Sequence, residues 1–281
     1  MTKVLLAGAT GYLGGYILNE LINRNYDLRV VVRSPSKLSP EEVKKIEILE
    51  AQVTEAESII NCCQDVDIVI STLGITRQKD GFKYIDVDYQ ANKNLLDEAL
   101  KHGVKKFIYI SVFKGRELRD LKICEAKELF VDELKQAQLE HCIIRPNGFF
   151  SDMAEFFHMA QKGRIFLFGD GEFKVNPIHG KDLAVVCVDA VKNNEKEIEV
   201  GGPEILSQNE IASIAFDVAG NEKKITYIPE WLIKISLFLL RTFTFQKFYG
   251  PIELFLTVLS QDMVAPAMGD FTLREFYMNL K

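Results

Sequence analysis

The 281-residue chain lacks the features that mark membrane, disulfide-rich, zinc-binding and nucleic-acid-binding proteins. No apolar run approaches the roughly 18 residues that suggest a membrane-spanning helix. The five cysteines are odd in number and none has C-x-x-C spacing, which disfavours a disulfide framework or a zinc site. The formal net charge of −6 disfavours nucleic acid as a partner, because a nucleic-acid groove is normally basic. We therefore expect a cytoplasmic protein that binds no nucleic acid and no metal.

The sequence also lacks internal repeats, low-complexity tracts and a proline-rich linker. Hydrophobic residues make up 47% of the chain and charged residues 26%, which is typical of a globular protein with a large core. The first apolar run, Val4–Ala7, is short and meets a glycine at once. It predicts a buried strand, not a signal peptide.

Short apolar runs alternate with helical patterns over the first half of the chain. We expect strands over residues 4–7, 28–32, 67–71, 107–112 and 142–144, and helices over 12–23, 91–101 and 124–137. Such alternation predicts an α/β fold, a Rossmann-type doubly wound parallel sheet, over residues 1–147. Residues 148–281 predict a smaller, mostly helical substrate lobe, with helices over 149–159 and 183–191 and a third opened by the capping box Ser207-x-x-Glu210. We expect the two parts to form a single compact unit with a soft boundary.

A glycine-rich turn, Gly8–Gly14, lies between the first predicted strand and the first predicted helix. Glycine allows the backbone to approach a pyrophosphate, and a helix N-terminus supplies N–H groups and a positive dipole end. We therefore predict that the turn binds the pyrophosphate of a dinucleotide, through Gly8, Thr10, Gly11, Tyr12, Leu13 and Gly14. The alternative is a tight structural turn without a ligand.

The end of the second predicted strand chooses between the two nicotinamide cofactors. An acidic residue there would bind the ribose of NAD, but this chain has Arg33, followed by Lys37. A guanidinium binds the 2′-phosphate of NADP in a bidentate contact, and Lys37 adds a point charge. NADP is therefore favoured over NAD, unless Arg33 is only a solvated charge at the end of a strand.

Motifs along almost the whole chain resemble the atypical short-chain dehydrogenase/reductases. The similarity is greatest to the NmrA-like group, which includes isoflavone-reductase-like and divinyl-chlorophyllide-reductase-like proteins. The motifs that carry it are the glycine turn, Val30–Arg33, Thr72–Gly74, Tyr109–Ser111, Ala126–Lys127, Ile144–Phe150, Phe168–Gly171, Asn176–Ala184 and Val264–Gly269.

This resemblance implies several site residues. Thr72, Leu73 and Gly74 would line the nicotinamide site, and Gln52 stands where relatives often carry an aspartate that contacts adenine. Ordinary members use a Tyr-x-x-x-Lys pair in which tyrosine is the proton donor. Lys127 matches the lysine, but the tyrosine position holds Ile123, which cannot transfer a proton.

Lys127 and Ser111 are the candidate catalytic residues, and each has alternatives. Lys127 either binds the nicotinamide ribose, acts itself as the general acid or base, or is an exposed helix charge. Ser111 either points into the crevice at the carboxyl end of its strand or caps that strand. Asn92 and Asn94 either order the site or lie on a helix surface.

The segment 231–249 is basic and aromatic and contains no acidic residue. It is either core, a substrate-pocket wall, a subunit contact or a helix that lies on a membrane surface.

Two functions are in competition. The first is an NADP(H)-dependent reductase that transfers hydride to a small hydrophobic substrate without the usual tyrosine. The second is a non-catalytic NADP(H) sensor, regulator or assembly factor. A sugar-nucleotide epimerase is a third and weaker hypothesis, because it needs the same missing tyrosine.

Overall fold

A computed structural model describes residues 2–75, 81–229, 231–232, 235, 242 and 246–281. The chain forms two compact units. The first comprises residues 1–145 and 183–198, and the second comprises residues 146–182 and 199–281. The expected boundary at residue 147 lies close to residue 145, where the chain first leaves unit 1. However, residues 183–198 return to that unit, whereas the sequence assigned them to the second part.

A seven-stranded sheet forms the centre of the first unit, in the order β3-β2-β1-β4-β5-β6-β9. The pairs from β3 to β6 are parallel. Ile143 N–H donates to Lys196 O and Asn147 N–H to Val200 O, so β9 also runs parallel to β6. The strands are β1 Lys3–Ala7, β2 Asp27–Val32, β3 Glu47–Glu50, β4 Ile68–Ser71, β5 Lys106–Ile110, β6 Glu140–Pro146 and β9 Glu197–Val200.

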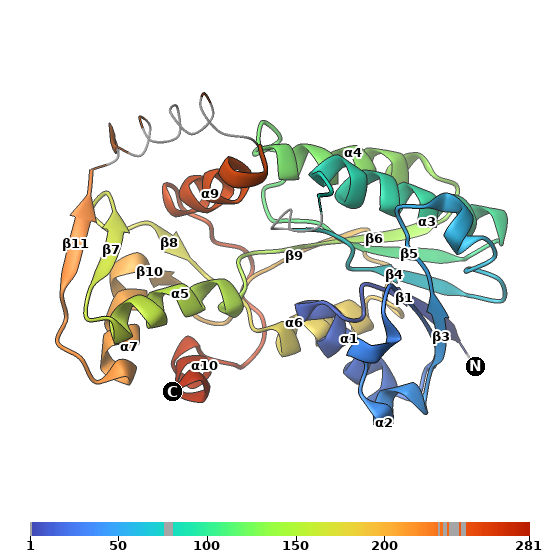
Figure 1. The fold of residues 1–281 in the computed structure, drawn as a ribbon, viewed down its shortest axis with the longest axis horizontal. Helices are drawn as coiled ribbons and strands as arrows, with labels where there is room; N and C mark the ends of the chain where they lie inside the picture. Colours follow the sequence, from blue (N-terminus) through green and yellow to red (C-terminus); the bar gives the residue numbers. More distant parts are fainter. Residues whose placement is uncertain (1, 76–80, 230, 233–234, 236–241, 243–245) are drawn as a thin grey trace. The chain divides into compact units, whose positions relative to one another are not determined.

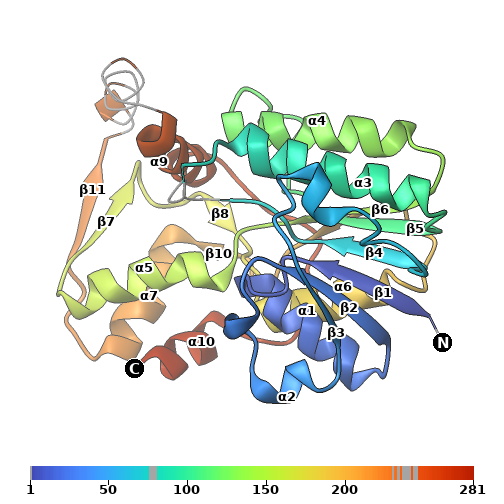
Figure 2. The same ribbon diagram turned by 45° about the vertical axis from the view of Figure 1, so that its right-hand side comes forward.

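Helices cover both faces of this sheet, which confirms the predicted Rossmann-type fold. Figures 1 and 2 show α3 (Asn92–Lys101) and α4 (Lys122–Gln136) on one face and α1 (Tyr12–Asn23) on the other. The inner strands are apolar along their length because both of their faces are buried. Residues Val4–Ala7 of β1, for example, are fully buried.

Shorter elements complete the first unit. These are η1 Pro35–Lys37, α2 Pro40–Val43, η2 Ala56–Ile59, the π-helical turn η3 Ile85–Ala91 and most of α6 Gly180–Asp189. The predicted strands and helices of this half are present with ends shifted by a few residues. The sequence missed β3 and β9, which are four residues long and each contain two glutamates, and it missed η3.

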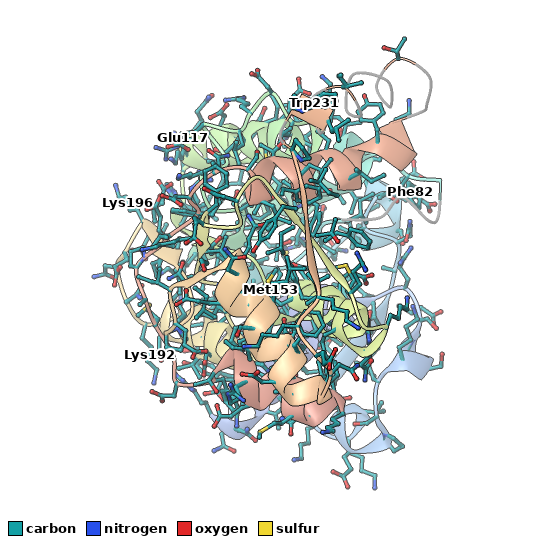
Figure 3. The ribbon with its side chains drawn as sticks, turned by 90° about the vertical axis from the view of Figure 1, so that its left-hand side faces the viewer. Phe82, Glu117, Met153, Lys192, Lys196 and Trp231 are labelled. Carbon is teal, nitrogen blue, oxygen red and sulfur yellow. The ribbon has the colours of Figure 1, made fainter. Side chains whose placement is uncertain are left out.

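Helices and short strands make up the described part of the second unit. The helices include α5 Phe150–Gln161, α7 Gln208–Ala219, α9 Gln246–Leu259 and α10 Leu273–Leu280. Parallel strands β7 (Ile165–Phe168) and β11 (Ile225–Ile228) form one small sheet, and antiparallel β8 (Lys174–Val175) and β10 (Leu206–Ser207) form another. The predicted capping box is present, since Ser207 Oγ accepts from Glu210 N–H at the start of α7. In Figure 3, Met153 marks α5, and the Met153 carbonyl accepts a hydrogen bond from the buried Tyr277 of α10.

Among the described residues, no helix has the length and apolar character needed to cross a bilayer. The predicted basic segment 231–249 falls mostly outside the described residues. Of those that are described, Trp231 and Ile235 are exposed.

Asp182 forms hydrogen bonds with the backbone of the C-terminal segment of the second unit. Asp182 lies in the first turn of α6, which begins two residues earlier, at Gly180. Its Oδ2 accepts the backbone N–H groups of Asp270, at 3.1 Å, and Phe271, at 3.0 Å. Gly269 adopts φ +85°, and a Cβ there would lie 2.3 Å from Asp182 Oδ2.

Replacing Asp182 with alanine is expected to lower the free energy of unfolding by about 1.5–3 kcal/mol, because two hydrogen bonds to a charged group are lost. Urea denaturation measures this change, and amide exchange at residues 270 and 271 should accelerate. Asp270→Ala is the control, since that side chain is exposed. Equal stability of the two variants would contradict the assignment.

Candidate functional site

The glycine turn joins β1 to the first turn of α1. Gly8 adopts φ +93°, and its carbonyl accepts the N–H of Gly11 at 2.9 Å. Gly11 is the N-cap of α1 and has no side chain with which to cap the helix. The N-terminus of α1 therefore opens directly onto the exposed turn, as an anion site requires.

Two of these glycines are required by close backbone contacts. A Cβ on Gly8 would lie 2.3 Å from Thr72 Oγ1, and a Cβ on Gly14 would lie 2.0 Å from Gly8 O. Gly14 and Leu13 are buried, so they support the turn from below. Neither these two residues nor Tyr12 belongs to the lining of the adjacent pocket, which differs from the sequence prediction.

A pocket extends from this turn along the carboxyl ends of β1, β2 and β4. It brings together most of the predicted cofactor residues, namely Gly8, Thr10, Gly11, Arg33, Lys37, Gln52, Thr72, Leu73 and Gly74. Apart from Thr54, the further lining residues are apolar and include Val31, Val53, Ile75 and Val87, together with Phe82, which Figure 3 labels. Ligands of open α/β sheets bind at this edge.

Arg33 and Lys37 give one part of this pocket a positive charge. Arg33 directly follows the last residue of β2, and Lys37 ends η1; both side chains are exposed. None of the described residues that line the pocket is acidic. The donor set of backbone N–H groups, one guanidinium and one ammonium therefore fits a ligand with several phosphoryl groups.

The two asparagines of α3 hold the pocket loops and are buried, which decides between the two alternatives for them. Asn92 Oδ1 accepts from Ser71 Oγ at 2.5 Å, and Asn92 Nδ2 donates to Leu73 O at 3.3 Å and to Asp88 O at 3.0 Å. Asn94 Nδ2 donates to Val53 O at 3.0 Å. Asn92 thus joins the loop after β4 to η3, and Asn94 fixes the loop after β3.

Gln52 lines the pocket with its amide oriented by a neighbour. Its Nε2 donates to Thr54 Oγ1 at 2.8 Å, and its backbone N–H donates to Ser58 Oγ. The amide oxygen is therefore the atom of Gln52 that is suited to accept a hydrogen bond from a ligand amine.

Lys127 forms an ion pair that the sequence did not predict. Its Nζ lies 2.9 Å from Asp88 Oδ1, and Asp88 is fully buried in η3. The Lys127 side chain retains 12% of its exposure, so it is not the exposed helix charge of the third alternative. A Cβ on Gly74 would lie 2.7 Å from Asp88 Oδ1 and 2.9 Å from Lys127 Nζ. The pair therefore lies against Gly74, which lines the pocket.

The environment of Lys127 favours its charged form. Burial by itself would lower the pKa of Lys127, but the Asp88 carboxylate and the Tyr109 hydroxyl raise that pKa above its usual value. Tyr109 is fully buried, and burial raises the pKa of its hydroxyl. Lys127 is therefore an ammonium at neutral pH.

Ser111, the second predicted catalytic residue, belongs to a buried ion-pair cluster. Its Oγ donates to Glu128 Oε1 at 3.2 Å and accepts from Arg145 at 3.3 Å. Arg145 also contacts Glu128 Oε2 at 3.0 Å and Glu197, so its guanidinium is satisfied. Ser111 is not among the lining residues of the pocket. A catalytic role for Ser111 stays a prediction, and its hydroxyl is hydrogen-bonded within this cluster.

Comparison with known proteins points to nucleotide binding. Residues 8–194 match the model of a family described as NAD(P)H-binding. The chain is 30% identical, over 81% of its length, to a divinyl chlorophyllide a 8-vinyl-reductase of Arabidopsis thaliana, and it spans 60% of that relative. It is 23% identical to the photosystem II assembly factor Ycf39 of Guillardia theta, over 82% of this chain and 74% of the relative.

Solved structures share the fold. An NADPH-dependent quinone oxidoreductase of Escherichia coli, crystallised with NADPH, superposes with a TM-score of 0.74 at 15% identity, and the match covers 99% of each chain. At that identity the likeness concerns the fold alone.

Gly14→Ala is expected to disrupt the turn, because the new methyl group would meet the Gly8 carbonyl. Unfolding should require less denaturant, and binding of a nicotinamide dinucleotide should be lost. Gly15→Ala is a matched control: its Cβ would meet only Ala9 O, at 3.8 Å, and a helical alanine should stabilise by about 0.5–1 kcal/mol. Parallel behaviour of the two variants would show that the contact is unimportant.

Glu128→Ala should lower the free energy of unfolding by about 3–5 kcal/mol, because it leaves the buried Arg145 without its main counter-charge. Asp132→Ala on the same helix removes the exposed partner of Arg119 and should cost less than about 1 kcal/mol. Chemical denaturation of both variants measures the difference, and a small loss for Glu128→Ala would argue against the cluster.

Proposed function

The chain belongs to the NAD(P)H-binding family, and from that premise we propose that it is an NADPH-dependent reductase of a small hydrophobic molecule. The observation that carries the proposal is the composition of one pocket. The glycine turn, two cations and the loop of Gly74 beside Lys127 line or adjoin the same cavity. Each can bind a different part of a reduced dinucleotide.

The preference for NADP over NAD follows from Arg33 and Lys37. A 2′-phosphate adds about two negative charges to the ribose, and a guanidinium matches its oxygens in a bidentate contact. The ribose hydroxyl of NAD needs an acceptor instead, usually a carboxylate. None of the described lining residues supplies one.

When bound, the nicotinamide supplies the hydride of the reaction. The chain's own residues would bind and orient the dinucleotide: the turn from Gly8 to Gly11 would hold the pyrophosphate, Arg33 and Lys37 would hold the 2′-phosphate, and Gln52 would bind adenine. Lys127 holds a proton at Nζ against Gly74. It can therefore supply the proton that a tyrosine gives in related enzymes, while Ile123 at the tyrosine position is buried.

The substrate we propose is a hydrophobic molecule with a conjugated double bond. A hydride adds to such a bond because the resulting negative charge is delocalised, and a cation such as Lys127 stabilises that charge. The relative from Arabidopsis thaliana is named for the reduction of a vinyl group, which belongs to this class. This chain spans 60% of that relative, so we propose a class of substrate and no individual compound.

A second function is favoured by Ile123. A chain that has lost the usual proton donor can keep its dinucleotide site as a sensor, or as a factor in assembly. The similarity to a protein named as an assembly factor agrees with this alternative.

Arg33→Ala should weaken NADP⁺ binding by about 10- to 100-fold, which corresponds to the loss of about 1.5–3 kcal/mol from a charge-assisted contact. NAD⁺ binding should be almost unchanged. Calorimetric titration of both cofactors measures this, and Lys44→Ala, which removes an exposed lysine from the same region, is the control. Equal loss for both cofactors would contradict the assignment of Arg33.

Anaerobic oxidation of NADPH, followed by absorbance against enones, quinones and vinyl-substituted aromatic compounds, tests the reductase itself. Turnover that Lys127→Ala abolishes, with NADPH still bound, would support the enzyme. Tight NADPH binding without turnover of any compound would favour the sensor.

A further inference from the structure

We propose that Asp88 is a positioning residue that holds Lys127 as an ammonium against the pocket wall, so that Lys127 donates a proton and does not act as a base. The inference rests on the proposed reductase for its chemical step. It adds a residue and a direction of proton transfer to that site.

Asp88 needs a charged partner because it is buried. Asp88 is fully buried, and an isolated carboxylate in that position would be costly without a charged partner. Lys127 Nζ, at 2.9 Å, is the counter-charge. The other carboxylate oxygen, Oδ2, accepts the backbone N–H of Ile75 at 3.2 Å. Asp88 thus contacts both the lysine and the loop that follows Gly74.

A hydrogen bond from Asn92 holds the backbone of Asp88 in place. The Asp88 carbonyl accepts from Asn92 Nδ2 at 3.0 Å, and Asn92 also contacts Leu73 O and Ser71 Oγ. Asp88 lies within the π-helical turn η3, a rare form that is frequent at functional sites. The same asparagine therefore fixes both the backbone of Asp88 and the pocket loop that Lys127 contacts.

Side chains from η3, β5 and α4 surround Lys127. They are Asp88 from η3, Tyr109 from β5, and Cys124 and Glu128 from its own helix. Lys127 Nζ lies 5.6 Å from the centre of the Tyr109 ring, a distance at which an ammonium is attracted to the ring. Glu128 forms an ion pair with Arg145, so Asp88 is the carboxylate in direct contact with Lys127.

When bound, NADPH would supply a hydride to one carbon of the substrate's double bond and would be left as NADP⁺, while Lys127 Nζ would give a proton to the other carbon. The N–H bond of Lys127 breaks as the second C–H bond forms. Lys127 is then neutral beside a buried carboxylate, which favours its reprotonation from water.

The test is competitive acetylation of lysines as a function of pH, read by mass spectrometry on the protein without cofactor. In the native protein Lys127 should resist acetylation well above pH 10, because only the neutral amine reacts. In Asp88→Asn its reaction should begin about 1–3 pH units lower, the size of shift that one adjacent opposite charge produces. Asp88→Glu, which keeps a carboxylate, should restore most of the resistance.

Asp97→Asn is the matched control, because it removes the exposed carboxylate that pairs with Lys93 on α3. It should leave the acetylation of Lys127 unchanged. If Asp88→Asn does not fold, the native profile still decides: acetylation of Lys127 at or below the pH at which exposed lysines react would overturn the proposal. So would an unshifted profile in a folded Asp88→Asn protein.

The pH profile of turnover separates this proposal from the proposed function. A lysine that donates a proton loses activity as pH rises through its pKa. Asp88→Asn should therefore move the basic limb of kcat to lower pH and leave the KM for NADPH unchanged. An acetylation shift in a protein that reduces no substrate would refute the reductase but uphold the pairing. A basic limb that stays in place would overturn the positioning role.

Discussion

The structure depends on one close approach, that of the Gly8 carbonyl and the backbone of Gly14. A side chain at position 14 would overlap the carbonyl, and a side chain at position 8 would overlap Thr72. These contacts bring the start of α1 close to the end of β1 and place the loop after β4 beside both. The anion site at the helix end and the wall formed by Thr72–Gly74 are therefore consequences of the same packing, since neither position has room for a Cβ.

Polar groups beneath the pocket then set its shape. Asn92 and Asn94 are buried on α3, and their amides bind main-chain groups of two different pocket loops. An asparagine satisfies several backbone groups at once, which a hydrophobic residue cannot do. The first turns of α3 and η3 thus contribute to the ligand site without lining much of it.

The parts of the site that depend on local sequence patterns could be predicted from the sequence. The glycine turn, Arg33 and Lys37 were predictable because glycine spacing and the residue after a strand carry their meaning locally. Asp88 was not, because its carboxylate matters only once η3 packs against α4, 39 positions along the chain from Asp88. The hydrogen-bond partners of Ser111 were not predictable for a related reason. The carboxyl end of a strand suggests a ligand crevice, but Glu128 and Arg145 take its hydroxyl. The same limit applied to β9, which joins the sheet through hydrogen-bond partners 53 residues earlier, Ile143 with Lys196 and Asn147 with Val200.

The return of residues 183–198 to the first unit has a consequence for how the protein is made. The last strand of the seven-stranded sheet, β9, begins only at Glu197. A ribosome therefore releases the glycine turn and six parallel strands long before the edge of the sheet can close. Until then the outer side of β6 has unpaired backbone groups, which are a template for pairing with other chains. The interval between synthesis of Pro146 and Val200 is thus the period in which the nascent protein is most exposed to aggregation.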